Sequence, residues 1–364
     1  MTRKLDKIAK SRPPKRKSGL SGGSRFWIAF TLLLLAAGLA TVIFPRAPQP
    51  QGFDRPSFDL QGHRGARGLM PENSLPAFEK ALALGVTTLE LDTVMTADGV
   101  VVVHHDRLLS PPRTRDAAGV WIAMEAPPAI LSLTAAELAA YDIGSAKPGS
   151  RVAERYPEQA RLDGVRIPAL AEVLARAEEV SGGIIRYNIE TKISPQAPEE
   201  SPDPQAFAEA LIAVLKDAGV TGRAAVQSFD WRTLQAVQKH APGIATVYLT
   251  AEQKWLDNLG RGGPAPSPWL AGLDIDWAEV TPPQAVARAG GAVWSPYYRD
   301  LTAADLKEAQ KLGLRVVVWT VNDPADMASL IDLGVDGIIT DYPDRARQVM
   351  AEKNLPLPPA FALD

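Results

Sequence analysis

The sequence has 364 residues, no cysteine and only four histidines. Without cysteine, the chain cannot form a disulfide framework, a thiolate-bound zinc or iron–sulfur centre, or a cysteine nucleophile. Hydrophobic residues make up 46% and charged residues 22%, a balance that excludes wholesale disorder and a fibrous or collagen-like chain. At roughly 100–200 residues per domain, the length suits two or three small domains or one large barrel with additions.

Positive charge is concentrated in the first 25 residues. Residues 1–25 hold nine lysines and arginines against a single acid, Asp6, which gives this segment a charge of +8. Because the whole chain carries −3, the remaining residues carry −11. No basic tract beyond the N-terminal segment could neutralise the many phosphates of a nucleic acid. We therefore expect a small-molecule substrate and no nucleic-acid partner.

A charge-free run of nineteen residues follows the basic segment, with the sequence FWIAFTLLLLAAGLATVIF at 26–44. As a helix at ~1.5 Å per residue it would span ~28 Å of hydrocarbon. Trp27 lies near one end, and Arg25 and Arg46 flank the run, which suits anchoring at the two interfaces. The basic excess predicts a single-pass membrane protein with a cytoplasmic N-terminus and an extracytoplasmic main domain, periplasmic if the source is Gram-negative.

A cleaved secretory signal is the alternative interpretation of the same run, because signals also have a basic start and an apolar middle. The small pair Gly38 and Ala40 offers a cleavage site, and cleavage there would leave a secreted protein. The length of both the basic and the apolar regions favours an uncleaved anchor. A buried helix of a soluble protein is a third interpretation.

Composition divides the rest of the chain. Residues 45–57 are rich in proline and polar residues and predict an extended linker, followed by a folded domain at 58–350 and a tail at 351–364. The segment 107–168 is rich in Pro, Arg, Ala and Gly and predicts an insertion beside the site. The segment 252–270 reads as a surface excursion.

Strand-like and helix-like runs alternate through the folded domain. Near-continuous apolar strands alternating with amphipathic helices are typical of a (β/α)8 TIM-type barrel of the α/β class. Ser74 and Asp323 are expected helix N-caps, with Gly85 and Gly334 at helix ends. The expected strands, one more than the barrel needs, are 58–63, 88–95, 100–105, 184–191, 224–228, 245–249, 292–294, 315–321 and 337–340. The expected helices include 74–84, 134–141, 170–178, 205–218, 302–312 and 324–333.

Three of the four histidines, His63, His104 and His105, lie at the ends of two expected strands. A single histidine at a strand end is more often a hydrogen-bonded structural residue. Here carboxylates gather at equivalent positions, which favours a functional site. His104 and His105 are adjacent, so they face opposite sides of a regular strand, and we expect His104 to be structural.

Carboxylates accumulate in the segments TLELDTV and NIETK. Glu90 and Asp92 are two apart on a strand, so both side chains point to the same face. Glu190 ends another apolar run, and Lys192 shares its face. Like charges close together in a barrel interior are costly unless a cation neutralises them, and oxygen ligands suit a hard divalent ion. An internal Glu190–Lys192 salt bridge is the competing interpretation.

Active sites of such barrels lie at the C-terminal ends of the strands. His63, Glu90, Asp92, His105 and Glu190 would therefore meet at one rim. Three carboxylates and two imidazoles suit metal-assisted hydrolysis, in which a cation offsets charge on a phosphate-like substrate while the histidines transfer protons.

These residues resemble the glycerophosphodiester phosphodiesterase family. The segment HRGARGLMPENS, which begins at His63, and the segment from Gly85 to Asp106 that contains TLELDTV and HHD are similar to its opening signature. The resemblance continues through NIETK, QSFD at 227–230, VWTVN at 318–322 and DGIITDYP at 336–343, and it covers 58–350. A composite of spaced motifs is far more specific than one short pattern. The Pro-Pro stretch after Leu109 departs from the family pattern, which leaves headgroup preference open.

The resemblance implies a role for each matching residue. His63 and His105 would be the catalytic acid/base pair, and Glu90, Asp92 and Glu190 would bind one divalent metal ion, calcium or magnesium. Substrate or phosphate contacts would come from Arg64, Glu72, Asn73, Lys192 and Trp319. Asp106 would fix the local backbone or the neighbouring imidazole. Trp319 would cover the glycerol moiety; ordinary core packing is the alternative for Trp319 and Phe229, and a turn with a helix start is the alternative for Glu72 and Asn73.

The resemblance also implies the reaction. A glycerophosphodiester would be hydrolysed to glycerol 3-phosphate and an alcohol, and the 2-hydroxyl of the glycerol can attack phosphorus to give a cyclic phosphate that water opens. Lysophospholipase D-like hydrolysis on the same barrel is an alternative, which an apolar rim from Trp121, Ile122 or Met124 would favour. A non-catalytic phosphodiester-binding module is a further alternative, although the acid/base pair and metal ligands are all present.

Overall fold

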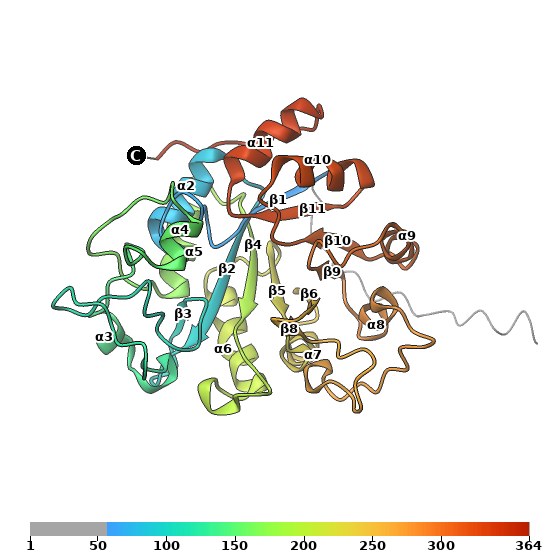
Figure 1. The fold of residues 1–364 in the computed structure, drawn as a ribbon, viewed down its shortest axis with the longest axis horizontal. Helices are drawn as coiled ribbons and strands as arrows, with labels where there is room; N and C mark the ends of the chain where they lie inside the picture. Colours follow the sequence, from blue (N-terminus) through green and yellow to red (C-terminus); the bar gives the residue numbers. More distant parts are fainter. Residues whose placement is uncertain (1–56, 364) are drawn as a thin grey trace, which may run out of the picture. The chain divides into compact units, whose positions relative to one another are not determined.

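The computed structural model describes residues 57–363. Eight parallel strands form its barrel, in the order β1-β2-β4-β5-β6-β9-β10-β11, and β1 pairs with both β2 and β11, which closes the sheet (Figure 1). The strands are β1 (Asp59–Gly62), β2 (Thr88–Met95), β4 (Arg186–Thr191), β5 (Ala224–Ser228), β6 (Ala245–Thr250), β9 (Val293–Pro296), β10 (Arg315–Val318) and β11 (Gly337–Thr340). The expected TIM-type barrel is confirmed.

The ninth expected strand lies outside the barrel. Strand β3 (Val101–Val103) pairs antiparallel with the end of β2, with Thr93 opposite Val103. It forms a hairpin extension of β2, so the barrel keeps eight strands. The surplus strand of the sequence pattern is therefore real but peripheral.

At least one helix follows each barrel strand. The helices are α2 (Leu75–Leu84), α5 (Leu170–Ser181), α6 (Pro204–Asp217), α7 (Trp231–His240), α8 (Pro282–Arg288), α9 (Ala303–Lys311), α10 (Pro324–Leu333) and α11 (Pro343–Glu352). The expected caps are present: Ser74 accepts from Ala77 N, and Asp323 accepts from the first-turn amides of α10. Gly85 ends α2 with φ 90°, a left-handed conformation that glycine adopts without a Cβ clash.

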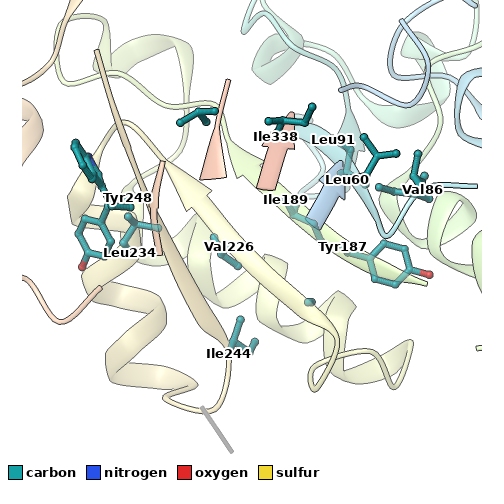
Figure 2. Close-up of a cluster of buried hydrophobic side chains, with 14 of the residues drawn as sticks. Leu60, Val86, Leu91, Tyr187, Ile189, Val226, Leu234, Ile244, Tyr248 and Ile338 are labelled. Atoms are coloured by element: carbon teal, nitrogen blue, oxygen red, sulfur yellow. The ribbon is translucent and has the colours of Figure 1, made fainter. Parts of the chain in front are cut away.

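Side chains alternate along each strand between two environments. Outward-facing residues such as Leu60, Leu91 and Ile338 belong to the main hydrophobic core between strands and helices, and Figure 2 shows these side chains with Tyr248 beside Leu234 of α7. Inward-facing apolar residues form a separate cluster on one half of the barrel: Ala225, Ala245, Val247, Ala292, Val293, Val317 and Ile339. The other half of the interior is polar.

The segment 107–168 forms a small folded unit beside the barrel. It contains η1 (Ile130–Ser132), α3 (Ala135–Leu138) and α4 (Arg151–Arg155). Its apolar residues build their own cluster against β2 and β3, with Leu109, Ile130, Leu138, Ile143 and Ile167 buried. Helix α3 is the core of the helix expected at 134–141.

Two other connections carry short elements. A 3-10 turn, η2 (Pro198–Glu200), follows β4. After β6 the chain forms a hairpin from β7 (Glu252–Gln253) and β8 (Leu256–Asp257), then η3 (Pro268–Leu270).

The regular elements of the folded domain begin with β1 and end with α11. Strand β1 begins at Asp59, and α11 ends at Glu352. The following tail runs back to α2, where Phe361 N donates to Leu82 O at 3.1 Å. Among residues 57–363, none of the helices combines the length and apolar character needed to cross a bilayer. The segment predicted to span the membrane, 26–44, lies outside the described residues.

Candidate active site

A cavity of about 1440 Å³ opens at the C-terminal ends of the barrel strands. Its wall includes His63 after β1, Glu90 on β2 and Glu190 on β4. His105, which follows β3, and Lys192, which follows β4, also line it. Because parallel strands end at one rim, residues far apart in the sequence share this cavity.

Three carboxylates meet on neighbouring strands. Glu90 and Asp92 point inward from β2, and the β2–β4 register places Asp92 opposite Glu190. One carboxylate oxygen from each residue lies within 4.8 Å of the others, and all three residues are buried. The spacing of two in TLELDTV and the strand pairing together produce the cluster predicted from the sequence.

Neighbouring donors orient the carboxylates. Glu90 accepts from Gln227 Nε2 at 2.6 Å and from the Arg64 backbone amide at 2.8 Å. Asn73 Nδ2 donates to Asp92 Oδ2 at 2.8 Å. Asp92 Oδ1 is buried and accepts no hydrogen bond from the described residues. This oxygen has no hydrogen bond to satisfy it and could bind a metal ion, although Lys192 Nζ lies 3.7 Å away.

Burial and mutual repulsion strain the ionised cluster. Burial, with the nearby Asp92 charge, raises the pKa of Glu90 well above its usual value. Burial likewise raises the pKa of Glu190 to about 7, against the opposing effect of Lys192. Although burial opposes ionisation of Asp92 too, Arg64 and other nearby cations hold the pKa of Asp92 well below its usual value. A divalent cation would relieve this repulsion, and the donor set of carboxylate oxygens fits calcium or magnesium.

The alternative salt bridge is also present. Lys192 Nζ lies 2.7 Å from Glu190 Oε1 and 3.7 Å from Asp92 Oδ1. Arg64 Nε is 3.2 Å from Asp92, but Arg64 also pairs with Glu72 at 2.7 Å. Two cations, one of them shared with a fourth carboxylate, do not balance three buried carboxylates. The Lys192 pair therefore accompanies the cluster without neutralising it.

Asp341 orients the first imidazole. His63 Nδ1 lies 2.5 Å from Asp341 Oδ1, and Asp341 is fully buried at the end of β11. Asn322 Nδ2 and the Tyr156 hydroxyl donate to its other oxygen at 2.7 and 3.1 Å. Arg64 Nε donates to His63 Nε2 at 3.3 Å, so the bonds at both ring nitrogens assign the proton to Nδ1. Burial lowers the pKa of His63, which favours the neutral imidazole.

Asp106 orients the second imidazole in the same way. His105 Nδ1 lies 2.6 Å from Asp106 Oδ1, and Arg113 Nη2 donates to Asp106 Oδ2 at 2.8 Å. Burial, together with Arg64 and Lys192, lowers the pKa of His105 to about 3. The adjacent His104 bonds the Asp106 carbonyl through Nδ1 at 2.7 Å and is not among the residues that line the cavity.

Glu72 and Asn73 lie behind the cavity wall rather than in it. Glu72 is buried and pairs with Arg64 at 2.7 Å, Arg67 at 2.6 Å and Arg113 at 3.5 Å. Although burial opposes its charge, these three guanidinium groups hold the pKa of Glu72 well below its usual value. Both residues therefore act through others, Glu72 through its arginines and Asn73 through Asp92.

Aromatic side chains form the opposite wall. Trp319, after β10, stacks edge-to-face with Phe229 at 5.3 Å between ring centroids, and Tyr297 lies 5.4 Å from Trp319. Trp319 is half-buried and its Nε1 donates to Ser295 O at 2.9 Å. Trp255, from the hairpin after β6, lies 6.0 Å from Trp319. Trp319 thus faces the cavity, and the segment 252–270 is more than a surface excursion because Trp255 lines the site.

Several site residues had no role assigned from the sequence. Gln227 and Asp341 lie inside matched motifs, so the motif itself was the available signal. Arg113 and Tyr156 come from the insertion, where no local pattern marks them. Asp106 bonds the neighbouring imidazole, as the sequence suggested. The apolar rim suggested for lysophospholipids is not formed by Trp121, Ile122 or Met124, because none of them is among the described residues that line the cavity.

Comparison with known proteins agrees with this geometry. The profile of the glycerophosphoryl diester phosphodiesterase family matches residues 63–345. A glycerophosphodiester phosphodiesterase from Bacillus subtilis (strain 168) is 31% identical over 295 residues, which cover 79% of this chain and 84% of that protein.

Solved structures share the fold. A crystal structure from Silicibacter pomeroyi, classified as a glycerophosphoryl diester phosphodiesterase, superposes with a TM-score of 0.73 at 35% identity and covers 84% of this chain and 98% of its own. An Oleispira antarctica phosphodiesterase in complex with the product sn-glycerol-3-phosphate has a TM-score of 0.57 at 21% identity and covers 80% of this chain and 96% of its own. The motifs, the barrel and the profile match agree, and the chain belongs to the glycerophosphoryl diester phosphodiesterase family.

Proposed function

We propose that this chain hydrolyses glycerophosphodiesters to glycerol 3-phosphate and an alcohol, using one divalent metal ion and a histidine acid/base pair. The observation that carries the proposal is the meeting in one region of three buried carboxylates and two imidazoles, each bonded to a carboxylate of its own. Family membership supplies the reaction class, phosphodiester hydrolysis.

Glu90, Asp92 and Glu190 would hold the metal ion, calcium or magnesium. The hydrogen-bond-free Asp92 Oδ1 and the excess of carboxylates over cations support this assignment. When bound, the ion offsets negative charge on the phosphate and so favours attack at phosphorus. Arg64 and Lys192 would add positive charge at the same phosphate, since both line the cavity beside the cluster.

His63 and His105 would transfer the protons. Each has Nδ1 bonded to a carboxylate, so each can take or release a proton at Nε2 while the carboxylate stabilises the imidazolium. One imidazole would remove the proton of the glycerol 2-hydroxyl as its oxygen bonds phosphorus, and the other would give a proton to the alcohol oxygen that leaves phosphorus. Water would then open the resulting cyclic phosphate to glycerol 3-phosphate, with the two imidazoles in reversed roles. Asp341 and Asp106 are positioning residues, because they act through the imidazoles.

The test is a coupled assay for glycerol 3-phosphate released from glycerophosphocholine by the full chain. We expect a chelator to abolish activity, and calcium or magnesium to restore it. His63→Ala and Glu90→Ala should each remove it, whereas His240→Ala, at the exposed fourth histidine on α7, should not. Activity that persists in a well-folded Glu90→Ala variant would contradict the metal assignment.

The same assay addresses the alternatives. Release of the headgroup from lysophosphatidylcholine, with no activity on glycerophosphodiesters, would replace this proposal with the lysophospholipase D-like reaction. A folded chain that turns over neither substrate would be a binding module.

The membrane anchor at 26–44 stays a prediction from hydropathy and charge. It would place the catalytic domain outside the cytoplasm. Fractionation of cells that express the full chain tests it, because an anchored chain sediments with membranes and a cleaved one is released.

A further inference from the structure

One end of the cavity carries more aromatic surface than a glycerol needs. Trp255 and Tyr297 pack edge-to-face, with 5.5 Å between centroids and 89° between planes. Trp319 stands at 77° to Trp255, and Tyr298 lies 5.2 Å from Tyr297. Because these rings are nearly perpendicular to one another, their faces point in different directions. Phe229 and Trp319 together are enough to cover a three-carbon glycerol.

Trp255 is the most unusual member of this aromatic end. It lies at the turn of the β7–β8 hairpin and is 60% exposed, although it lines the cavity. Exposing a large indole to water forfeits the stabilisation that its burial would contribute. Its place at the rim is therefore not explained by packing, and a ligand that reaches the rim would cover it.

Charge is unequally distributed between the two ends. The end near β1, β2 and the insertion holds the arginines Arg64, Arg67, Arg107, Arg113 and Arg155. The aromatic end holds the carboxylates Asp323 and Asp326 of the α10 N-terminus and, of the described residues, a single arginine, Arg299. A zwitterion with a phosphate and a cation matches this polarity when its cation lies against the rings.

The rings already contact cations of the chain itself. The Arg299 guanidinium lies 5.3 Å from the centroid of Tyr298, and Lys192 Nζ lies 6.0 Å from that of Phe229. Arg299 covers Tyr298, so the rings left for a ligand cation are Trp255 and Tyr297 with the adjoining face of Trp319. Aromatic faces attract cations through the ring quadrupole, and methylated ammonium groups suit such a cage because their surface is apolar.

We propose that Trp255 and Tyr297, with Trp319, form a headgroup subsite for a methylated ammonium cation, so that choline diesters are preferred among glycerophosphodiesters. The inference rests on the proposed function and names its substrate class. The two alcohol arms leave phosphorus at tetrahedral angles, so both can contact this wall: glycerol at Phe229 and Trp319, and the trimethylammonium group nearer the rim. Trp255 is then a specificity-determining residue of this chain.

The first test compares headgroups in the full chain and its Trp255→Ala variant. The substrates are glycerophosphocholine, glycerophosphoethanolamine and glycerophosphoglycerol. We expect Trp255→Ala to raise KM for the choline diester about ten-fold, with kcat nearly unchanged and the glycerol diester unaffected. Trp255→Phe should recover part of the loss, because it restores a ring face. An equal rise of KM for all three headgroups would overturn the proposal.

Met124→Ala is the matched control, because Met124 is 66% exposed and lies outside the cavity lining. It should leave KM for every headgroup unchanged. The same rise of KM in Met124→Ala as in Trp255→Ala would overturn the proposal, because exposed apolar area rather than the cage would then set affinity.

A second measurement separates this inference from the proposed function, because it needs no turnover. Tetramethylammonium is titrated with the full chain while the line width of its methyl protons is followed by NMR. We expect broadening that Trp255→Ala removes and Met124→Ala retains. Broadening without any glycerol 3-phosphate release would leave the subsite standing and refute the hydrolase proposal. Hydrolysis without any broadening would refute the subsite and leave the hydrolase proposal standing.

Discussion

The two halves of the barrel interior differ sharply in polarity. Strands β1, β2, β4 and β5 point Gln61, Glu90, Asn188 and Gln227 inward, whereas β6, β9, β10 and β11 point Val247, Val293, Val317 and Ile339 inward. The outward-facing residues of both halves belong to one hydrophobic core. The hydrophobic core between the strands and the helices thus stabilises the barrel on all sides. The side chains inside the barrel can therefore be polar on one half and apolar on the other.

The polar half is linked by hydrogen bonds. Asn188 Nδ2 donates to Gln61 Oε1 at 2.8 Å and to Gln227 Oε1 at 3.0 Å, and Gln227 donates onward to Glu90. Buried amides cost stability unless they are bonded. This network bonds Asn188 Nδ2 and both polar atoms of Gln227 while it orients Glu90 of the carboxylate cluster, and Asn188 Oδ1 has no partner among the described residues. The comparison teaches that the buried carboxylate cluster requires a polar layer beneath it, whereas the aromatic wall of the cavity does not.

Removing an imidazole from the polar half should have the largest effect. We expect His63→Ala to lower kcat about 10⁴-fold, because proton transfer at that position disappears. Circular dichroism should show an unchanged fold, since the hydrophobic core on the outside of the strands is untouched. His240→Ala is the matched control and should retain full kcat. A loss of less than about ten-fold in His63→Ala would remove His63 from the acid/base pair.

Placing a carboxylate in the apolar half tests whether that half of the barrel interior tolerates a buried charge. Val317→Asp should lower the free energy of unfolding by about 4 kcal/mol, because the neighbouring side chains Val293 and Ile339 offer no partner for the charge. Urea denaturation followed by circular dichroism measures this loss. Val317→Thr, with nearly the same shape, should cost far less. Equal stability of the Asp and Thr variants would show that this half also tolerates charge.

Asp341→Asn should lower kcat about 10²-fold while the chain stays folded, because the carboxylate that orients His63 and stabilises its charged form is lost. Asp341 raises the pKa of His63. Its removal therefore lowers that pKa further, and the acidic limb of the kcat/KM profile should move to lower pH. The exposed Asp332→Asn on α10 is the control. An unmoved acidic limb would assign Asp341 a purely structural role.

Gln227→Leu should have the smallest effect of the four. Glu90 loses the donor at 2.6 Å and Asn188 loses an acceptor, so we expect stability to fall by about 1–3 kcal/mol. The concentration of calcium needed for half-maximal activity should rise, because Glu90 is less well oriented. Gln238→Leu, which removes an amide from α7 outside the cavity, serves as the control. An unchanged calcium requirement in Gln227→Leu would show that the amide network does not influence metal binding by the carboxylate cluster.

Much of the fold was predictable because its signals are local. All nine expected strands exist, and Ser74 and Asp323 cap the expected helices. The ninth strand was surplus because a run of four valines, Val100–Val103, looks the same in a barrel and in a hairpin. Only the pairing with β2, which is antiparallel, distinguishes the two.

The sequence by itself determined which residue types could carry the chemistry. Alternation along TLELDTV places Glu90 and Asp92 on one face, and this follows from the geometry of a single strand. Positions at strand ends added His63, His105 and Glu190, and motif similarity gave these residues their roles. These inferences depend on a few consecutive residues or on a match to a family, so they need no knowledge of the closed barrel.

Only the tertiary structure decided which partners complete those residues. His63 bonds Asp341, which is 278 residues away, because β11 closes the barrel against β1. Arg113 of the insertion reaches Glu72, 41 residues earlier in the chain, and Trp255 reaches the cavity from a hairpin expected to lie on the surface. Such contacts are set by strand register and by loop paths, which depend on the whole packed structure and leave no local pattern in the chain.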